Sequence, residues 1–208
     1  METLSLLFTN ATRVKLMRLF LFNTTESYNL KQLAERTKCE PRDLEKELPL
    51  LVKAGMIVPK KVNDTLVVKK GKKTLERKVK VWSWHLDLGF EFLLPLQNLL
   101  INIPPLRSKE MLERLSGVGK LKLVIVAGVF IQDPTSRIDL LVVGDNIKKG
   151  LVDKKIKVME SEIGKELNYA AFETADFQYR LGVCDKLVSD IIDYPHERLL
   201  DKLNPESL

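Results

Sequence analysis

The pattern of apolar and polar positions divides the chain into a mainly helical first part and a second part of mixed character. Apolar residues recur at helical spacing over residues 11–22, 30–37 and 41–53, which predicts three amphipathic helices. Two segments that favour β-structure follow, at residues 56–58 and 79–86, with a lysine-rich stretch between them. The pattern therefore predicts three helices followed by a two-stranded hairpin.

Individual residues mark the ends of these elements. Asn29 precedes the second helix as an N-cap, Pro41 suits the first turn of the third helix, and Gly55 is placed to end it. Pro49 lies inside the third helix, where it is expected to kink the helix or shift its end. The order of elements is that of a winged helix-turn-helix, in which the second helix of the pair enters a DNA major groove.

The second part alternates short apolar runs with helical patterns, which is typical of a small α/β domain. Two prolines in the sequence Ile101-Asn-Ile-Pro-Pro end the helical pattern before them. We therefore predict a winged-helix domain over 1–88, a connecting helix and linker over 89–106, and a second domain over 107–208. The predicted helices are 90–101, 108–115, 152–163 and 174–181, with further short helices to the end, and the predicted strands are 121–127, 138–143 and 167–172.

Charge changes this picture because it is unevenly distributed. The chain of 208 residues has a net charge of +6, but residues 1–84 hold 18 basic and 9 acidic residues, whereas residues 85–208 hold 16 and 19. The densest block is 57–80, with nine basic residues against two acids. A basic half joined to a mildly acidic half suggests two modules with different partners.

The position of the lysine block after three helices favours double-stranded DNA as the partner. Each phosphate that a lysine neutralises releases counterions, so such binding is salt-dependent. We expect Arg42 and Lys46 of the third helix to contact the groove and Lys38 to lie on the backbone at the helix start. The remaining expected contacts come from the hairpin: Lys60, Lys61, Lys69, Lys70, Lys72, Lys73, Arg77 and Lys78.

One feature of the third helix favours a different partner. Asp43, Glu45 and Glu47 are expected to face outward with the basic residues, and acids oppose contact with a polyanion. A protein-binding module is therefore the alternative hypothesis. Trp82 and Trp84 share one strand face and are expected to pack the hairpin onto the helices, with stacking on bases as the alternative.

The second domain resembles the DNA-polymerase-β-like nucleotidyltransferases, especially the small antitoxin-type members. The resemblance rests on a strand, Gly128, a loop of about ten residues, and then Ser136-Arg-Ile-Asp-Leu-Leu-Val-Val-Gly-Asp. The whole chain is also similar to bacterial proteins in which a winged helix precedes such a domain. The family carries Gly-Ser after the first strand, an Asp-x-Asp pair at the second strand, and a third acid on a later strand.

Departures from the family pattern indicate lost chemistry. Gly128 and Asp139 match family residues, but Val129 replaces the serine, Arg137 replaces the first acid, and the third strand has no acid. Family chemistry needs several carboxylates to hold Mg²⁺, so we expect no catalytic residues, no metal and no cofactor. An active nucleotidyltransferase is the less favoured alternative that the resemblance leaves. Gly128, Arg137 and Asp139 form either a remnant phosphate or nucleotide site, or a local Arg137–Asp139 ion pair in a scaffold for protein contact.

The remaining features set the expected cellular context. No apolar run approaches the ~20 residues of a membrane span, and no basic leader precedes the first helix. Cys39 and Cys184 fit no disulfide framework, and Cys184 is expected to be a small side chain buried in the core. We expect a cytoplasmic regulator that forms a homodimer, as is common on two-fold DNA sites, with a nucleotide or protein as a further partner of the second domain.

Overall fold

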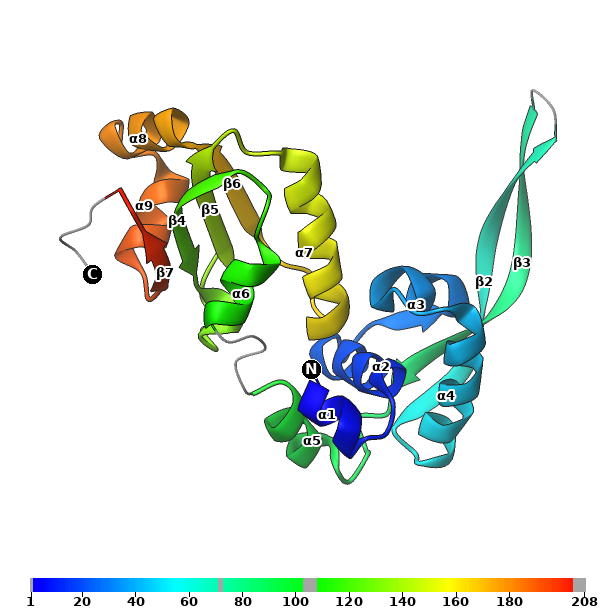
Figure 1. Ribbon diagram of the computed structural model, residues 1–208. Coiled ribbons are helices and arrows are strands. Elements are labelled where there is room, and N and C mark those ends of the chain that lie inside the picture. Colours follow the sequence, from blue (N-terminus) through cyan, green and yellow to red (C-terminus); the bar gives the residue numbers. More distant parts are fainter. Residues whose placement is uncertain (1, 71–72, 103–107, 204–208) are drawn as a thin grey trace. The chain divides into compact units, whose positions relative to one another are not determined.

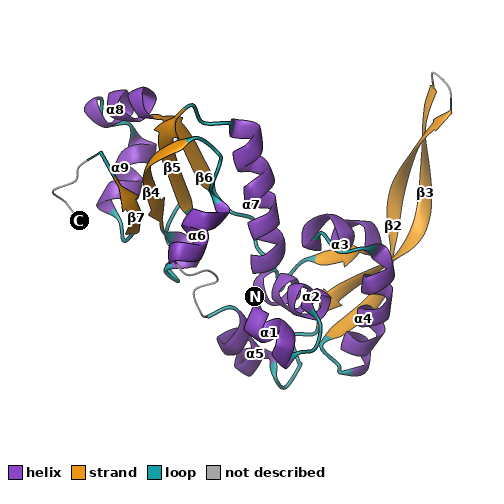
Figure 2. Ribbon diagram, in the orientation of Figure 1, coloured by secondary structure: helices purple, strands orange, loops and turns teal. Residues whose placement is uncertain are grey.

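The computed structural model describes residues 2–70, 73–102 and 108–203, and it is a mixed α+β structure with two sheets (Figures 1 and 2). The chain forms two compact units. The first contains Met1–Leu100 together with Ser161–Lys165, and the second contains Ile101–Glu160 together with Glu166–Leu208. Each unit has its own sheet and its own buried core, so the two are described separately.

The described part of the first unit contains the three predicted helices and two others. The predicted helices are confirmed as α2 (Ala11–Phe22), α3 (Leu30–Thr37) and α4 (Pro41–Lys53). A short helix α1 (Glu2–Leu7), which the pattern did not predict, precedes them, and α5 (Leu93–Leu100) is shorter than expected. The apolar stripes of the helices meet in one core, whose largest fully buried members include Leu16, Phe20, Leu33, Leu44, Leu48 and Met56.

A three-stranded sheet with the order β1-β3-β2 completes the first unit. Strands β2 (Ile57–Lys70) and β3 (Lys73–Leu86) pair along their whole length and are longer than predicted. Strand β1 (Ser27–Asn29), which the pattern did not predict, pairs with the base of β3 and ends at the capping residue Asn29. Three residues carry too little pattern to reveal a strand, and Tyr28 is its one buried member.

Two sequence features of the α3–α4 region have the expected local roles, and one does not. Asn29 forms a capping box with Gln32 at the start of α3, and Gly55 follows α4 with a positive φ of 77°. Pro49, however, does not move the end of α4, which continues to Lys53. Proline has no backbone N–H, so the carbonyl four residues before Pro49 has no donor within the helix. Pro49 is exposed, which places this carbonyl on the outer side of the helix, where water can donate to it.

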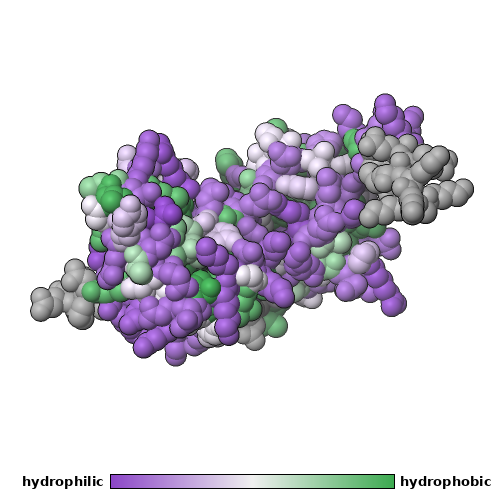
Figure 3. All heavy atoms as spheres, turned by 90° about the horizontal axis from the view of Figure 1, so that it is seen from above, coloured by the Kyte–Doolittle hydropathy of each residue, from purple (hydrophilic) through white to green (hydrophobic). Residues whose placement is uncertain are grey.

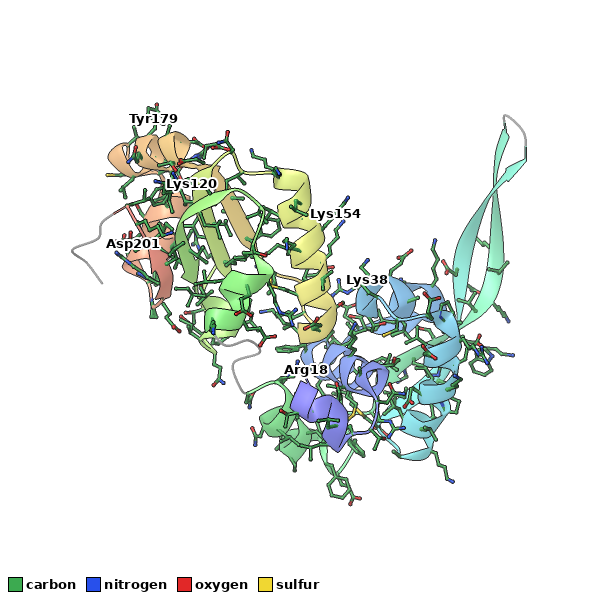
Figure 4. All side chains as sticks on the ribbon, in the orientation of Figure 1. Arg18, Lys38, Lys120, Lys154, Tyr179 and Asp201 are labelled. Carbon is green, nitrogen blue, oxygen red and sulfur yellow. The ribbon has the colours of Figure 1, made fainter. Side chains whose placement is uncertain are left out.

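A buried arginine of α2 ties the first unit together. Arg18 is 4% exposed; its Nε donates to the carbonyl of Leu100 at 3.0 Å and its Nη1 to the carbonyl of Glu162 at 2.9 Å (Figure 4). Burial lowers the pKa of Arg18, and the charge of Glu162 opposes that shift. Gly164 lies so close to this helix that a Cβ there would be 2.6 Å from the carbonyl carbon of Arg18.

The second unit is a four-stranded sheet with helices. Its helices are α6 (Ser108–Arg114), α8 (Thr174–Gly182), α9 (Lys186–Asp193) and most of α7 (Lys149–Ile163), whose last three residues belong to the first unit. Its strands are β4 (Lys120–Val126), β5 (Leu140–Asp145), β6 (Tyr169–Glu173) and β7 (Glu197–Asp201). The sheet order is β6-β5-β4-β7, and only the β5–β6 pair is parallel. The prediction that short helices close the chain is wrong for residues 197–201, because β7 pairs with the edge of β4.

One buried cluster of the second unit lies between strands β4 and β5 and helices α8 and α9. Leu123, Ile125, Leu141 and Val143 of the strands contact Phe177, Val188 and Ile191 of the helices. Cys184 does not join this core, contrary to expectation. It is exposed and lies between α8 and α9 with a φ of 52°, so its backbone makes a turn that keeps the thiol outside.

Seen from above, most of the side chains drawn in colour are hydrophilic (Figure 3). Across the described residues, none of the helices has the length and apolar content needed to cross a bilayer.

Candidate nucleic-acid interface

Helix α4 turns its apolar stripe inward and its basic residues outward. Leu44, Leu48 and Leu51 are buried, and they are spaced so that Arg42 and Lys46 fall on the opposite side, where both are exposed. The Nζ of Lys46 lies 3.4 Å from a carboxylate oxygen of Asp43. Both side chains are about half exposed or more, so the pair is weak and leaves Lys46 available for another anion.

The structure corrects the expected charge of this helix. Glu47 does not face outward, because it is 5% exposed and packs against α2. Its two carboxylate oxygens accept from Arg13 Nε at 2.7 Å and from Asn10 Nδ2 at 2.6 Å. The three predicted outward acids therefore reduce to Asp43, which is paired, and Glu45. This removes much of the objection to contact with a polyanion.

Lys38 lies at the turn between α3 and α4, as Figure 4 shows. It ends α3 in the left-handed conformation, with φ 53° and ψ 33°. Its side chain is exposed, whereas the neighbouring Thr37 is buried and bonds back to Leu33 within the helix. The left-handed residue reverses the chain between the two helices and places a cation three residues before Pro41, the first residue of α4.

The β2–β3 ribbon extends beyond the helices of its own unit (Figure 1). Lys61 is paired with Trp82 in the register, and Lys80 and Lys78 follow at alternate positions along β3. Since side chains alternate between the faces of a strand, these four residues share one face. All three lysines are exposed, so this face carries a row of cations.

Of the other predicted basic contacts, one lies on the second face of the ribbon, and the rest have side chains outside the described part of the structure. Lys60, adjacent to Lys61, lies on the opposite face and is exposed. The backbones of Lys69, Lys70, Lys73 and Arg77 belong to the paired strands, but their side chains lie outside the described ones. Lys72 lies outside the described residues altogether. Lys80, which was not among the predicted contacts, is identified by its two-residue spacing from Lys78 and Trp82.

The expected packing of the two tryptophans holds only in part. Trp84 is half-buried, whereas the side chain of Trp82 is 51% exposed and therefore does not simply anchor the ribbon on the helices. The Nζ of Lys61 lies 4.9 Å from the centre of the Trp82 ring, which is a cation–π geometry. A large aromatic ring and several cations therefore meet at the base of the ribbon.

In the second unit, Asp139 is a structural residue at the position expected for a metal ligand. It is 3% exposed; its Oδ1 accepts from the amide of Val129 at 2.8 Å, and its Oδ2 from the amide of Asn168 at 2.9 Å. Gly128 has a φ of 53°, and a Cβ there would lie 2.2 Å from the same Oδ1. The structure thus brings Gly128 and Asp139 together, with the carboxylate joining two loops.

Arg137 does not take part in that arrangement. Its Nη1 donates to Asp190 of α9 at 2.9 Å, and its side chain is 68% exposed. The hypothesis of an Arg137–Asp139 ion pair is therefore wrong, since the two side chains have different partners. Arg137 instead lines a small pocket of about 320 Å³ that also includes Ser136, Lys186 and Asp190.

Two other acids near this loop, Asp133 and Asp145, also accept hydrogen bonds within the second unit. Asp133 accepts from the hydroxyl and the amide of Thr135, at 2.6 and 2.9 Å, and these hydrogen bonds lower the pKa of Asp133. Asp145 accepts from the hydroxyl of Thr174 at 2.6 Å. Among the described residues, no three histidine, cysteine or acidic side chains come together as a potential metal site.

Comparison with protein-family models, with curated proteins and with solved structures finds no match to this chain.

Proposed function

We propose that the first unit is a winged helix-turn-helix that binds double-stranded DNA, with α4 as the groove helix and the β2–β3 ribbon as the wing. The observation that carries this proposal is the basic face of the ribbon, where Lys61, Lys78 and Lys80 lie in one row beside an exposed Trp82. The element order supports it. Helices α3 and α4 are consecutive and joined by a short turn, and the two strands that follow form a hairpin on the same sheet as β1.

Charge favours a backbone-binding role over close base reading. Helix α4 offers Arg42 and Lys46 at its exposed side, but Asp43 and Glu45 are close by. The wing supplies most of the excess positive charge, and contacts from lysine to phosphate carry little sequence information. We therefore propose strong salt dependence and modest sequence specificity.

We further propose that the second unit is a degenerate nucleotidyltransferase-like domain that does not catalyse transfer and instead contacts another copy of the chain or another protein. The hydrogen bonds that occupy Asp139 support this, because a carboxylate committed to two backbone amides and shielded from solvent is a poor Mg²⁺ ligand. We likewise propose that two chains pair on a two-fold DNA site, as winged-helix regulators commonly do.

Fluorescence anisotropy with a random-sequence duplex, titrated at increasing salt, tests the DNA proposal. A protein that neutralises several phosphates gives a linear log–log plot with a slope of about 0.9 per phosphate. Replacing Lys61, Lys78 and Lys80 together by Gln should lower that slope by about two to three units. The fold should persist, because all three side chains are exposed.

The matched control replaces three exposed lysines of α7, Lys149, Lys154 and Lys157, by Gln. It removes the same charge and should leave the slope nearly unchanged. If both triple variants reduce affinity equally, the protein binds through net charge alone and the wing assignment is wrong. If the unaltered protein shows no binding even at low salt, the DNA proposal fails and a protein-binding role for the winged helix takes its place.

A further inference from the structure

A large groove lies inside the first unit, between the helices and the base of the ribbon. Its volume is about 830 Å³, and it is bounded by the start of α3, the second half of α4 and both strands β2 and β3. Small-molecule sites typically measure about 300–1,000 Å³, so one drug-sized ligand fits this space. DNA binding through exposed lysines does not account for such a cavity.

The walls of the groove are flat and apolar. Trp82 and Trp84 form one side, Pro59 lies next to them, and Pro49 and Val52 of α4 face the same space. Trp82 is half exposed, and the Nζ of Lys61 lies over its ring, 4.9 Å from the ring centre. Aromatic rings bind other rings by offset stacking, which favours a planar ligand over a branched aliphatic one.

The rim of the groove carries more positive than negative charge. Lys31, Lys53 and Lys80 lie around it, together with the acids Glu45 and Asp64. The carboxylate of Asp64 already accepts from the side-chain amide of Asn29 at 2.9 Å. Three basic and two acidic side chains give the rim a net positive charge, which favours an anionic group on the ligand over a cationic one.

We propose that this groove binds a planar aromatic molecule with one negative charge, and that its occupancy controls DNA binding. The ring lies against Trp82 and Trp84, and the anionic group is held by the rim lysines. The regulatory half rests on the proposed function: Lys80 belongs to both the basic face of the wing and the rim, and α4 lines the groove, so the ligand and the DNA share these elements. The ligand-binding half stands independently of it.

Isothermal titration calorimetry with 1-naphthoate tests the ligand-binding half. The chain has two tryptophans, and both line the groove, so intrinsic tryptophan fluorescence reports on the same event. We expect saturable binding with one site per chain and a matching change in fluorescence. The neutral amide, 1-naphthamide, should bind at least fivefold more weakly because it lacks the charge.

Two variants locate the site. Trp82→Ala should weaken naphthoate binding at least tenfold, whereas Phe92→Ala removes an aromatic ring of similar exposure outside the groove and should change it less than twofold. Lys80→Gln should bring naphthoate affinity close to that of the amide. A thermal unfolding midpoint close to that of the unaltered protein verifies that each variant is folded. If Trp82→Ala unfolds, Lys80→Gln gives the decisive result, because Lys80 is exposed and its replacement should leave the fold intact.

Contrary outcomes are distinct for the two halves. Absence of saturable naphthoate binding, equal affinity for the amide, or equal loss in Trp82→Ala and Phe92→Ala each overturns the ligand-binding half. An apolar peptide that displaces naphthoate and binds more tightly reassigns the groove to a protein partner.

The regulatory half is tested by repeating the DNA anisotropy titration at saturating naphthoate. We expect the Kd for DNA to change at least fivefold, and the Kd for naphthoate to change by the same factor when DNA is present, because coupling is reciprocal. An unchanged Kd overturns regulation but leaves ligand binding intact. Failure to bind DNA at all refutes the proposed function together with regulation, while the calorimetry still decides the groove.

Discussion

At the scale of the residue, the second unit shows how a buried carboxylate can be committed to the backbone. Both carboxylate oxygens of Asp139 accept from backbone amides, those of Val129 and Asn168. Gly128 is equally constrained, since the space beside it is taken by that carboxylate. Each of the two residues therefore limits what can stand at the other position.

This packing predicts the effect of Gly128→Ala. The new Cβ would lie 2.2 Å from Asp139 Oδ1 at a residue with a φ of 53°. The left-handed backbone alone costs about 1–2 kcal/mol for a non-glycine residue, so we expect the free energy of unfolding to fall by about 2 kcal/mol or more. Urea denaturation monitored by circular dichroism measures it.

The control for that substitution is Gly150→Ala in α7. A Cβ at Gly150 meets no atom within 4 Å, and alanine in a helix is favoured over glycine by about 0.5–1 kcal/mol. We expect this variant to be as stable as the unaltered protein or slightly more so. Equal stability of the two variants would show that Asp139 moves easily and that the loop is not held as described.

At the scale of the element, a side chain of one helix holds the ends of two others. Arg18 of α2 donates to carbonyls at the end of α5 and in the last turn of α7. Carbonyls at helix C-termini lack partners within their own helix and carry partial negative charge, which favours a cation there. Arg18 thus supplies hydrogen-bond donors to carbonyls at the ends of two other helices, as a capping residue does at the end of its own helix.

We expect Arg18→Met to lower the free energy of unfolding by about 1–3 kcal/mol. It keeps much of the buried apolar stem but leaves the carbonyls of Leu100 and Glu162 without this donor, and a buried unsatisfied acceptor costs that much. Hydrogen exchange should also rise in residues 161–165. Arg42→Met, at an exposed position of α4, is the matched control and should change neither property. A stable Arg18→Met protein with unchanged exchange would contradict the anchoring role.

At the scale of the whole molecule, the charge of the chain divides between two compact units with different chemistry. The basic excess lies in the first unit and is concentrated on the ribbon, whereas several acids of the second unit bond to partners within that unit. Asp139 binds backbone amides, Asp190 pairs with Arg137, and Asp145 accepts from Thr174. This division supports one unit for a polyanion and another for protein contact.

The same division predicts that Mg²⁺ will not activate the second unit. Incubation with nucleoside triphosphates, Mg²⁺ and candidate acceptors should give no labelled product, because Asp139 is shielded from solvent and both of its carboxylate oxygens accept from backbone amides. Calorimetry should likewise show no heat of nucleotide binding that depends on Mg²⁺. Metal-dependent transfer that disappears in Asp139→Asn, in a variant shown to be folded, would reverse this assignment.

The sequence by itself determined the helices α2, α3 and α4, most of the α/β pattern of the second unit, and the location of the basic charge. Apolar periodicity and capping residues are local properties, so a linear pattern contains them. It did not reveal β1 or β7. Each is short and has a mixed pattern, and each becomes a strand only because the edge of β3 or β4 is free to pair with it.

Only the tertiary structure decided which charged residues are available. Glu47 and Arg42 lie five residues apart on one helix. Glu47 is buried because Arg13 and Asn10 donate hydrogen bonds to it, whereas Arg42 is exposed. Arg137 and Asp139 are two residues apart, yet they bond to different elements. Hydrogen-bond partners distant in sequence decide whether a charged side chain is buried or exposed, because an ionised group is buried only where such partners contact it.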